Sequence, residues 1–256
     1  MRLESERVIA VRGKTIGGPS PVICLPLVAK ETSEVLSQAE ALKQFDPDLV
    51  EWRIDGYDNV EEIDDCMSVL KTLREKIGNI PIIFTCRIDA EGGFKQISEG
   101  VRLNLVQAAI ESGHIDLVDV EMCNETAFIE EIKTAAERHG TRLILSYHNF
   151  DRTPDESFIL GKLSQAQEMG GHVAKVAVMA KSYKDVLVLL SATLEARMEH
   201  LNIPIITMSM GPEGRVTRLA GALFGSVLTF AVGKATSAPG QIPIADLRQA
   251  MSVLYD

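Results

Sequence analysis

The feature of this sequence that most constrains its fold is a regular alternation between short apolar runs and longer helix-like segments. The runs are nearly continuous in valine, isoleucine and leucine, a pattern typical of strands buried on both faces of a parallel sheet. Their starts lie roughly 30 residues apart, the usual size of a strand–helix unit. The eight predicted strands are Val22–Leu27, Leu49–Arg53, Ile80–Cys86, Ile115–Glu121, Arg142–Tyr147, His172–Val178, Pro204–Ser209 and, with a weaker pattern, Leu223–Thr229.

Between these runs, apolar residues recur at intervals of three or four, which indicates helices with one buried face. The predicted helices are Thr32–Gln44, Val60–Ile77, Gly100–Ser112, Glu125–His139, Asp155–Met169 and Tyr183–His200. Strands that alternate with helices predict an α/β fold in which helices cover a parallel sheet. A closed (β/α)8 TIM barrel accounts for eight units in 256 residues better than an open doubly wound sheet, which is the alternative.

The segment before the first strand predicts a β-hairpin. Arg7–Ile16 has Arg12-Gly13 at its centre, and such a hairpin could close the base of the barrel. No linker rich in proline or serine divides the chain that follows. We therefore expect residues 1–256 to form a single (β/α)8 barrel catalytic domain.

The charge balance and the cysteines narrow the range of partners. The chain has 26 Lys+Arg against 36 Asp+Glu, a net charge of −10, which disfavours binding to nucleic acids and to anionic membranes. Residues 1–13 lack the apolar core of a signal peptide, and no apolar run approaches the roughly 20 residues that span a bilayer. The four cysteines, Cys24, Cys66, Cys86 and Cys123, do not have zinc-ligand spacing. We expect a cytoplasmic protein that binds a small molecule and uses no metal.

A lysine in the middle of the sixth predicted strand is the most informative single residue. Lys175 is flanked by Val173-Ala174 and Val176-Ala177, and a buried ammonium is costly unless it is paired or neutral. A neutral buried amine can attack a carbonyl group and form an imine. The alternative is a structural lysine that pairs with an acid or reaches out of the end of the barrel.

Other polar residues stand where the apolar runs stop, and the carboxyl ends of the strands build the active site of such a barrel. Glu51 and Arg53 are two positions apart and therefore point the same way along their strand. Of the five histidines, His148 is best placed for proton transfer near neutral pH, although a structural role is the alternative. Arg53, Arg87 and Arg218 together favour recognition of a carboxylate and hydroxyl groups, unless each pairs with a surface acid.

These polar segments resemble, in order and over nearly the full chain, those of the type I 3-dehydroquinate dehydratase family. The matching segments are Glu51-Trp52-Arg53-Ile54-Asp55, Phe84-Thr85-Cys86-Arg87, Glu91-Gly92-Gly93, Ser146-Tyr147-His148-Asn149-Phe150, Lys175-Val176-Ala177, Met208-Ser209-Met210-Gly211, Arg218, Phe224-Gly225-Ser226 and Ala235-Thr236-Ser237-Ala238-Pro239-Gly240-Gln241. The resemblance implies a hydro-lyase of the shikimate pathway, which leads to chorismate and the aromatic amino acids. Such an enzyme converts 3-dehydroquinate into 3-dehydroshikimate without a cofactor.

The resemblance also implies a role for each site residue. Lys175 would form an imine with the ketone, His148 would act first as general base and then as general acid, and Glu91 would orient His148. The binding residues would be Glu51, Arg53 and Arg87 for the ring hydroxyls and Arg218, Ser237 and Gln241 for the carboxylate. The loop from Ser237 to Gln241 would close over the substrate, and the family likeness implies a homodimer.

Two other functions are alternatives to this interpretation. One is another class I Schiff-base barrel enzyme, such as an aldolase, which would usually bind a phosphate after the seventh and eighth strands. In this sequence Arg218 stands in that region and better suits a carboxylate. A ligand-binding barrel without catalysis would have no need of Lys175, His148 and Glu91 together. Lys234 is an alternative nucleophile that we expect to be exposed, protonated and non-catalytic.

Overall fold

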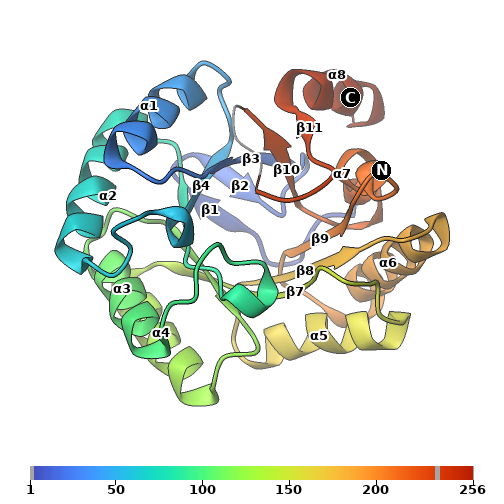
Figure 1. The fold of residues 1–256 in the computed structure, drawn as a ribbon. Helices are drawn as coiled ribbons and strands as arrows, with labels where there is room; N and C mark the ends of the chain where they lie inside the picture. The colour runs from blue at the N-terminus through green and yellow to red at the C-terminus, as the bar shows by residue number, and fades with distance from the viewer. Residues whose placement is uncertain (1–2, 234–236, 256) are drawn as a thin grey trace.

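The structure is a computed structural model that describes residues 3–233 and 237–255. It is a (β/α)8 barrel, as predicted, with parallel strands as the inner wall and helices as the outer layer (Figure 1). The strands of the wall are β3 (Val22–Leu27), β4 (Leu49–Arg53), β5 (Ile82–Thr85), β6 (Leu117–Glu121), β7 (Arg142–Asn149), β8 (Val173–Met179), β9 (Ile205–Met210) and β10 (Leu228–Val232).

Each strand pairs in parallel with the next strand along the chain, and β10 pairs with β3. The ring closes between β9 and β10, where Ile205 and Ser226 form a bridge and the amide of Val227 donates to the carbonyl of Ile205 at 2.9 Å. A short strand, β11 (Ile242–Pro243), adds to the carboxyl end of β10. The wall therefore surrounds a single interior. We call the end of the barrel at the carboxyl ends of the strands its upper end.

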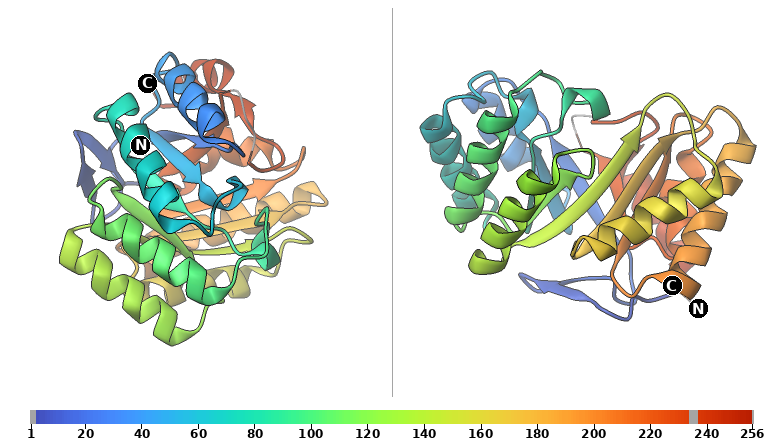
Figure 2. Two further views of the ribbon diagram at one scale, coloured as in Figure 1. Left: turned by 60° about the vertical axis from the view of Figure 1, so that its left-hand side comes forward. Right: turned by 90° about the horizontal axis from the view of Figure 1, so that it is seen from below.

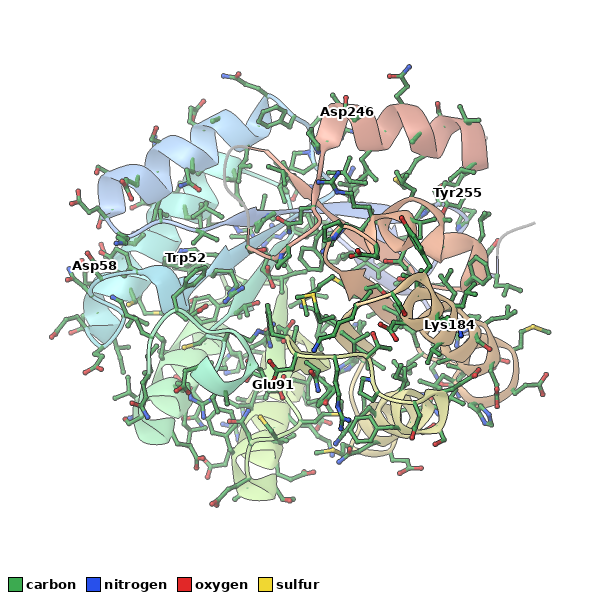
Figure 3. The ribbon with its side chains drawn as sticks, turned by 45° about the vertical axis from the view of Figure 1, so that its right-hand side comes forward. Trp52, Asp58, Glu91, Lys184, Asp246 and Tyr255 are labelled. Carbon is green, nitrogen blue, oxygen red and sulfur yellow. The ribbon has the colours of Figure 1, made fainter. Side chains whose placement is uncertain are left out.

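The outer layer contains the six predicted helices and two more. The predicted ones are α1 (Thr32–Lys43), α2 (Ile63–Ile77), α3 (Glu99–Glu111), α4 (Thr126–His139), α5 (Glu156–Glu168) and α6 (Tyr183–Glu195), which the π-helical turn Ala196–His200 extends. The sequence patterns did not predict α7 (Arg215–Ala220) or α8 (Ile244–Tyr255). Outward-facing strand residues such as Trp52 fill the layer between the wall and these helices (Figure 3). In the part of the chain that the structure describes, no helix is long and apolar enough to cross a membrane.

The predicted position of the last strand is wrong. Leu223–Thr229 was expected, but Gly221–Phe224 form a 3-10 turn and β10 begins only at Leu228. Gly225 ends that turn with φ +111°, and a Cβ atom there would lie 2.7 Å from the side chain of Arg197. The glycine therefore interrupts the apolar run, and the strand forms from the residues after it.

The predicted N-terminal hairpin is confirmed, and it closes the base of the barrel (Figure 2, right). Strands β1 (Ile9–Val11) and β2 (Lys14–Ile16) are antiparallel, and Arg12 and Gly13 both have positive φ, as a two-residue type I′ turn requires. Ile9 and Ile16 are buried against the lowest inward-facing layer of the wall. That layer consists of Val22, Leu49, Ile83, Leu117, Ile144, Val173 and Ile206.

The hairpin should therefore stabilise the barrel as part of its core. We expect Ile16→Ala to lower the free energy of unfolding by about 2–5 kcal/mol, because it removes a fully buried side chain and leaves a cavity. Urea unfolding followed by the fluorescence of Trp52, the single tryptophan, measures the change. Val8→Ala, at a half-exposed position beside β1, is the control; equal losses in the two variants would show that the hairpin is not part of the core.

Candidate active site

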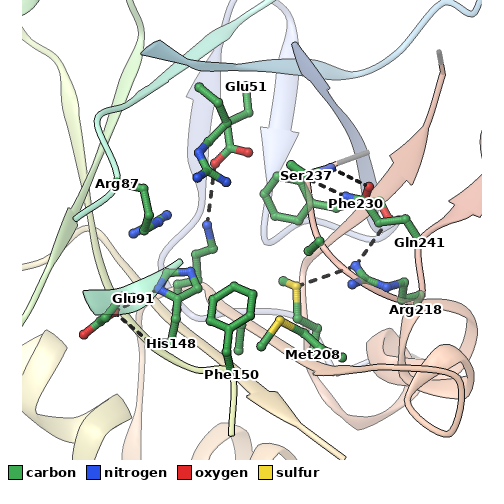
Figure 4. A pocket seen from close by; sticks show the side chains of 15 residues that line it. Glu51, Arg87, Glu91, His148, Phe150, Met208, Arg218, Phe230, Ser237 and Gln241 are labelled. Carbon is green, nitrogen blue, oxygen red and sulfur yellow. Dashed lines mark hydrogen bonds and ion pairs between the residues drawn. The ribbon is translucent and has the colours of Figure 1, made fainter. Parts of the chain in front are cut away.

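All nine residues predicted for the site line one pocket at the carboxyl ends of the strands (Figure 4). They come from six parts of the barrel: Glu51 and Arg53 from β4, Arg87 and Glu91 from the segment after β5, His148 from β7, Lys175 from β8, Arg218 from α7, and Ser237 and Gln241 from the segment between β10 and β11. Apolar side chains complete the lining: Phe150, Ala177, Met208, Met210, Phe230 and Ala238.

Strand periodicity explains why polar groups gather above an apolar floor. Inward-facing positions on a strand are two residues apart. On β7, Ile144 belongs to the floor, and Ser146 and His148 follow above it; on β8, Val173 belongs to the floor and Lys175 follows. Ser146 and Lys175 are register partners on neighbouring strands, and both lie above this floor.

Lys175 is buried and paired with an acid. Its Nζ lies 2.6 Å from Oδ2 of Asp119 and 3.7 Å from Oε1 of Glu51. The same nitrogen lies 4.9 Å from the centre of the Phe230 ring, which adds a cation–π contact. The fixed amine thus lies among the inward-facing side chains that line the pocket.

Asp119 is the main residue that the sequence analysis missed. It is fully buried, and besides Lys175 it contacts Arg87 at 2.9 Å and the hydroxyl of Ser146 at 2.6 Å. Its signal was present in the sequence, because Asp119 and Glu121 alternate with valines in the same way that Glu51 and Arg53 flank a tryptophan. Two acids at alternate positions of a buried strand both face the inside of the barrel.

His148 and Glu91 form a second pair. Oε2 of Glu91 accepts a hydrogen bond from the backbone amide of His148 at 2.8 Å and lies 3.1 Å from Nδ1 of its ring. Burial, helped by the cations of Arg87 and Lys175, lowers the pKa of His148 well below its usual value, so the ring is neutral at pH 7. A neutral imidazole whose Nδ1 bonds a carboxylate keeps Nε2 free as a base.

The three arginines of the site have different partners. Arg53 makes two hydrogen bonds to Asp55, at 2.9 and 2.8 Å, and stacks on Phe94. Arg87 contacts both Asp119 and Glu121 through Nη1, at 2.9 and 2.8 Å. The alternative interpretation was that each arginine pairs with a surface acid. Arg53 and Arg87 do pair with acids, but these acids are buried in the barrel and do not lie on its surface.

Arg218 differs, because no carboxylate among the described residues pairs with it. Its contacts are the carbonyl of Phe230 at 3.4 Å, the carbonyl of Pro239 at 3.1 Å and the sulfur of Met208 at 3.6 Å. Nε is buried and has no hydrogen-bond partner in the part of the chain that the structure describes, and burial lowers the pKa of Arg218 to about 10. The guanidinium is still charged at neutral pH, so this side of the pocket has an unbalanced positive charge that suits an anion.

The loop segment Ser237–Gln241 lies beside Arg218. The amide of Ser237 donates to Oε1 of Gln241 at 3.1 Å, and Nε2 of Gln241 donates to the hydroxyl of Ser237 at 3.2 Å. Gly240 has φ +79°, and a Cβ atom there would lie 2.4 Å from the carbonyl of Gly211, so the loop packs closely on the end of β9.

Lys234, the alternative nucleophile, lies outside the described residues. Within those residues, no group of three or more His, Cys, Asp or Glu could hold a metal ion.

Comparison with known proteins identifies the family. The family model described as type I 3-dehydroquinase matches residues 23–256. The chain belongs to this family. This finding confirms the resemblance that the strand-end motifs indicated.

Relatives of this type I 3-dehydroquinase match it over almost their full lengths. 3-Dehydroquinate dehydratase of Geobacillus thermodenitrificans (strain NG80-2) is 45% identical over 251 residues, which cover 98% of this chain and 97% of the relative. The crystal structure of 3-dehydroquinate dehydratase from Geobacillus kaustophilus HTA426 has a TM-score of 0.96 at 45% identity, covering 99% and 98%. Type I 3-dehydroquinate dehydratase from Clostridium difficile, solved with covalently modified comenic acid, has a TM-score of 0.94 at 40% identity, covering 97% and 98%.

The environment of Glu91 predicts a pH-dependent cost in stability. Burial, reinforced by the charge of Glu121, raises the pKa of Glu91 from 4.5 to about 7. The folded state therefore holds this proton at pH values where the unfolded state has lost it, and stability falls as the pH rises from about 4.5 to about 7. Glu91→Gln removes this titration, so its stability relative to the parent should increase by up to about 3 kcal/mol between pH 5 and pH 8.

Urea unfolding of both proteins near pH 5 and near pH 8 measures this difference. The parent at each pH is the reference, because all other titrating groups are common to the two proteins. If the two proteins differed in stability by the same amount at both pH values, the raised pKa of the buried Glu91 carboxyl group would be contradicted.

Proposed function

We propose that this type I 3-dehydroquinase dehydrates 3-dehydroquinate to 3-dehydroshikimate through an imine on Lys175. The observation that carries the proposal is that an amine, a neutral imidazole and an unpaired guanidinium line the same pocket. The relatives have the name 3-dehydroquinate dehydratase, whose reaction belongs to the shikimate pathway. The covalently modified comenic acid in the Clostridium difficile relative fits a nucleophile in such a pocket.

The reaction begins at Lys175. Its nitrogen adds to the ketone carbon, the carbonyl oxygen leaves as water, and an iminium ion joins the enzyme to the substrate. The iminium ion withdraws electrons from the neighbouring carbon, so a proton on that carbon becomes acidic enough for an imidazole to remove. This activation supplies the electron sink that the elimination of a hydroxyl group needs.

His148 handles both proton transfers in this proposal. As a neutral base it takes the proton from the carbon beside the iminium, and an enamine forms. The protonated ring then donates that proton to the hydroxyl on the next carbon, which leaves as water, and a conjugated iminium ion remains. Hydrolysis releases 3-dehydroshikimate and restores the amine of Lys175. Glu91 orients the ring through its contacts to Nδ1 and to the backbone amide.

The remaining site residues bind the substrate. Arg218 pairs with the substrate carboxylate, since its charge is buried and no acid within residues 3–233 and 237–255 pairs with it. Ser237 and Gln241 add neutral donors beside it. Arg53 and Arg87 keep donors free for ring hydroxyls, because Arg53 bonds Asp55 through Nε and Nη2 and Arg87 bonds its acids through Nη1. Glu51 accepts from these hydroxyls. The loop from Ser237 to Gln241 closes over the bound ring.

The protein acts in this proposal as one catalytic domain of residues 1–256 in the cytoplasm. A single sheet from Val22 to Pro243 with one pocket at its carboxyl end supports the single domain. All four cysteines have free thiols, three of them buried, which fits a reducing compartment.

We further infer that two copies associate through the outer face of α6. Tyr183 and Leu187 lie one helical turn apart on this face, and their side chains are 73% and 65% exposed. The 3-10 turn Gly221–Phe224 packs against α6 and carries Leu223, which is also exposed. Apolar residues at neighbouring exposed positions favour burial against a partner, and the same face on a second copy would provide it.

Trapping of the imine tests the catalytic proposal. Incubation with 3-dehydroquinate should raise the ultraviolet absorbance of the conjugated product, and borohydride should then leave a reduced adduct that mass spectrometry locates on Lys175. Lys175→Met should lose both the adduct and turnover, whereas Lys71→Met, at an exposed position of α2, should keep both. Product without a trapped lysine would refute the imine mechanism, and absence of both would refute the reaction itself.

Light scattering tests the dimer. The parent should show twice the 28.0 kDa of one chain, and Leu187→Asp should show one chain, because a charge would be buried without a partner. Val253→Asp, at an exposed apolar position of α8, should remain dimeric. A parent with the mass of one chain, or a Leu187→Asp variant that stays dimeric, would contradict this interface.

A further inference from the structure

One acid within reach of the amine has no role in the mechanism above. Oδ2 of Asp119 lies 2.6 Å from Nζ of Lys175, whereas the oxygen of Glu51 lies 3.7 Å away. Asp119 is therefore the acid within hydrogen-bond distance of the atom that forms the imine. Its side chain is fully buried, so water does not screen its charge from that nitrogen.

The surroundings of Asp119 fix the carboxylate in one orientation. Its other oxygen, Oδ1, accepts from the hydroxyl of Ser146 at 2.6 Å and from Nη1 of Arg87 at 2.9 Å. Arg87 is shared with a second acid, Glu121, at 2.8 Å. The charge of Arg87 is thus balanced by Glu121, and Oδ2 of Asp119 is directed at Lys175.

The charges in this region keep Asp119 ionised. Burial acts to raise its pKa, but the cations of Arg87 and Lys175 outweigh burial and hold the pKa of Asp119 well below its usual value. An acid with so low a pKa is a poor proton acceptor. A permanent negative charge, and not a base, is therefore the function that its surroundings suit.

The chemistry of imine formation needs such a charge. An ammonium group and a ketone give an iminium ion and water: two of the three ammonium protons leave with the oxygen, and the third stays on the nitrogen. The positive charge is conserved at one atom, so an anion that pairs with the ammonium also pairs with the iminium. A neutral imine would be a weak electron sink, and removal of the neighbouring proton would slow.

We propose that Asp119 is the counter-ion of the Schiff base, which keeps the imine nitrogen of Lys175 protonated while His148 removes the proton from carbon. The inference rests on the imine mechanism proposed above. In this arrangement the iminium N–H donates to Oδ2, which also fixes the rotation of the substrate ring relative to His148. Among the described residues, Glu51, Arg53, Arg87, Glu91, His148 and Arg218 are the other charged or titratable groups that line this pocket. Glu121 adds its charge through Arg87, and the buried thiol of Cys24 lies close enough to Lys175 and Glu51 to interact with their charges.

The isosteric variant Asp119→Asn tests the inference. It keeps an acceptor for Ser146 and Arg87 but removes the negative charge, so kcat should fall by about 10²- to 10³-fold. The direct readout is the imine formed with the product, 3-dehydroshikimate, because a protonated conjugated imine absorbs at longer wavelength than a neutral one. On titration to alkaline pH, the long-wavelength band should disappear in Asp119→Asn at least about one pH unit below the parent.

Glu121→Gln is the matched control. It removes a carboxylate from the same strand and from the same arginine, but this carboxylate has no contact with Lys175. A merely structural role for the buried network predicts that both variants shift the titration of the imine equally. The counter-ion role predicts a shift in Asp119→Asn and none in Glu121→Gln.

The outcomes separate this inference from the function on which it rests. No product and no adduct in the parent would refute the proposed function. A parent that forms the imine, with an imine titration in Asp119→Asn equal to that of the parent, would refute the counter-ion alone. If Asp119→Asn does not fold, Asp119→Ala takes its place: sodium formate should restore kcat at least about tenfold, and no restoration would overturn the inference.

Discussion

The buried ion pair between Lys175 and Asp119 is the interaction on which the rest of the barrel interior depends. Two charges removed from water are costly, and loss of one partner from such a pair typically costs about 3–5 kcal/mol. The barrel offsets this cost with further paired groups around Asp119: Ser146, Arg87 and Glu121. Charged residues must therefore occupy inward positions on several neighbouring strands at once, and they do so above a floor that is entirely apolar.

The two sides of the pocket differ in how their charges are balanced. On one side, Arg53 and Arg87 pair with buried acids, so their positions are set before any ligand arrives. On the other side, Arg218 has only neutral partners, and its buried Nε has none among the described residues. Figure 4 shows His148 and Arg87 on the side opposite Arg218 and Gln241. In the proposed complex, the carboxylate and the ketone stand on different ring carbons, so only one orientation brings the carboxylate to Arg218 and the ketone to Lys175.

Much of this arrangement could be predicted from the sequence, because strand periodicity and strand ends are local features. The nine residues predicted for the site came from strand ends, from the lysine within the sixth strand and from the family resemblance, and all nine line one pocket. Asp119 lies within a run and not at its end, so a search of strand ends missed it. The start of β10 depends on Gly225 and its contact with Arg197, a tertiary constraint that apolar periodicity does not encode. Helix α7 was missed because its six residues make fewer than two helical turns, too few for an apolar period to show.

The burial of ionisable groups in the pocket reduces the stability of the protein. Burial raises the pKa of Glu91 and lowers that of Arg218, which means that each group is less well solvated in the fold than in water. A bound carboxylate would compensate Arg218, and an iminium would keep the charge that Asp119 already balances. In the proposed complex, the substrate carboxylate supplies the counter-charge that no carboxylate among the described residues gives to Arg218. The apolar floor and the hairpin beneath it offset the cost of burying these ionisable groups, because they form a continuous core that has no part in the chemistry.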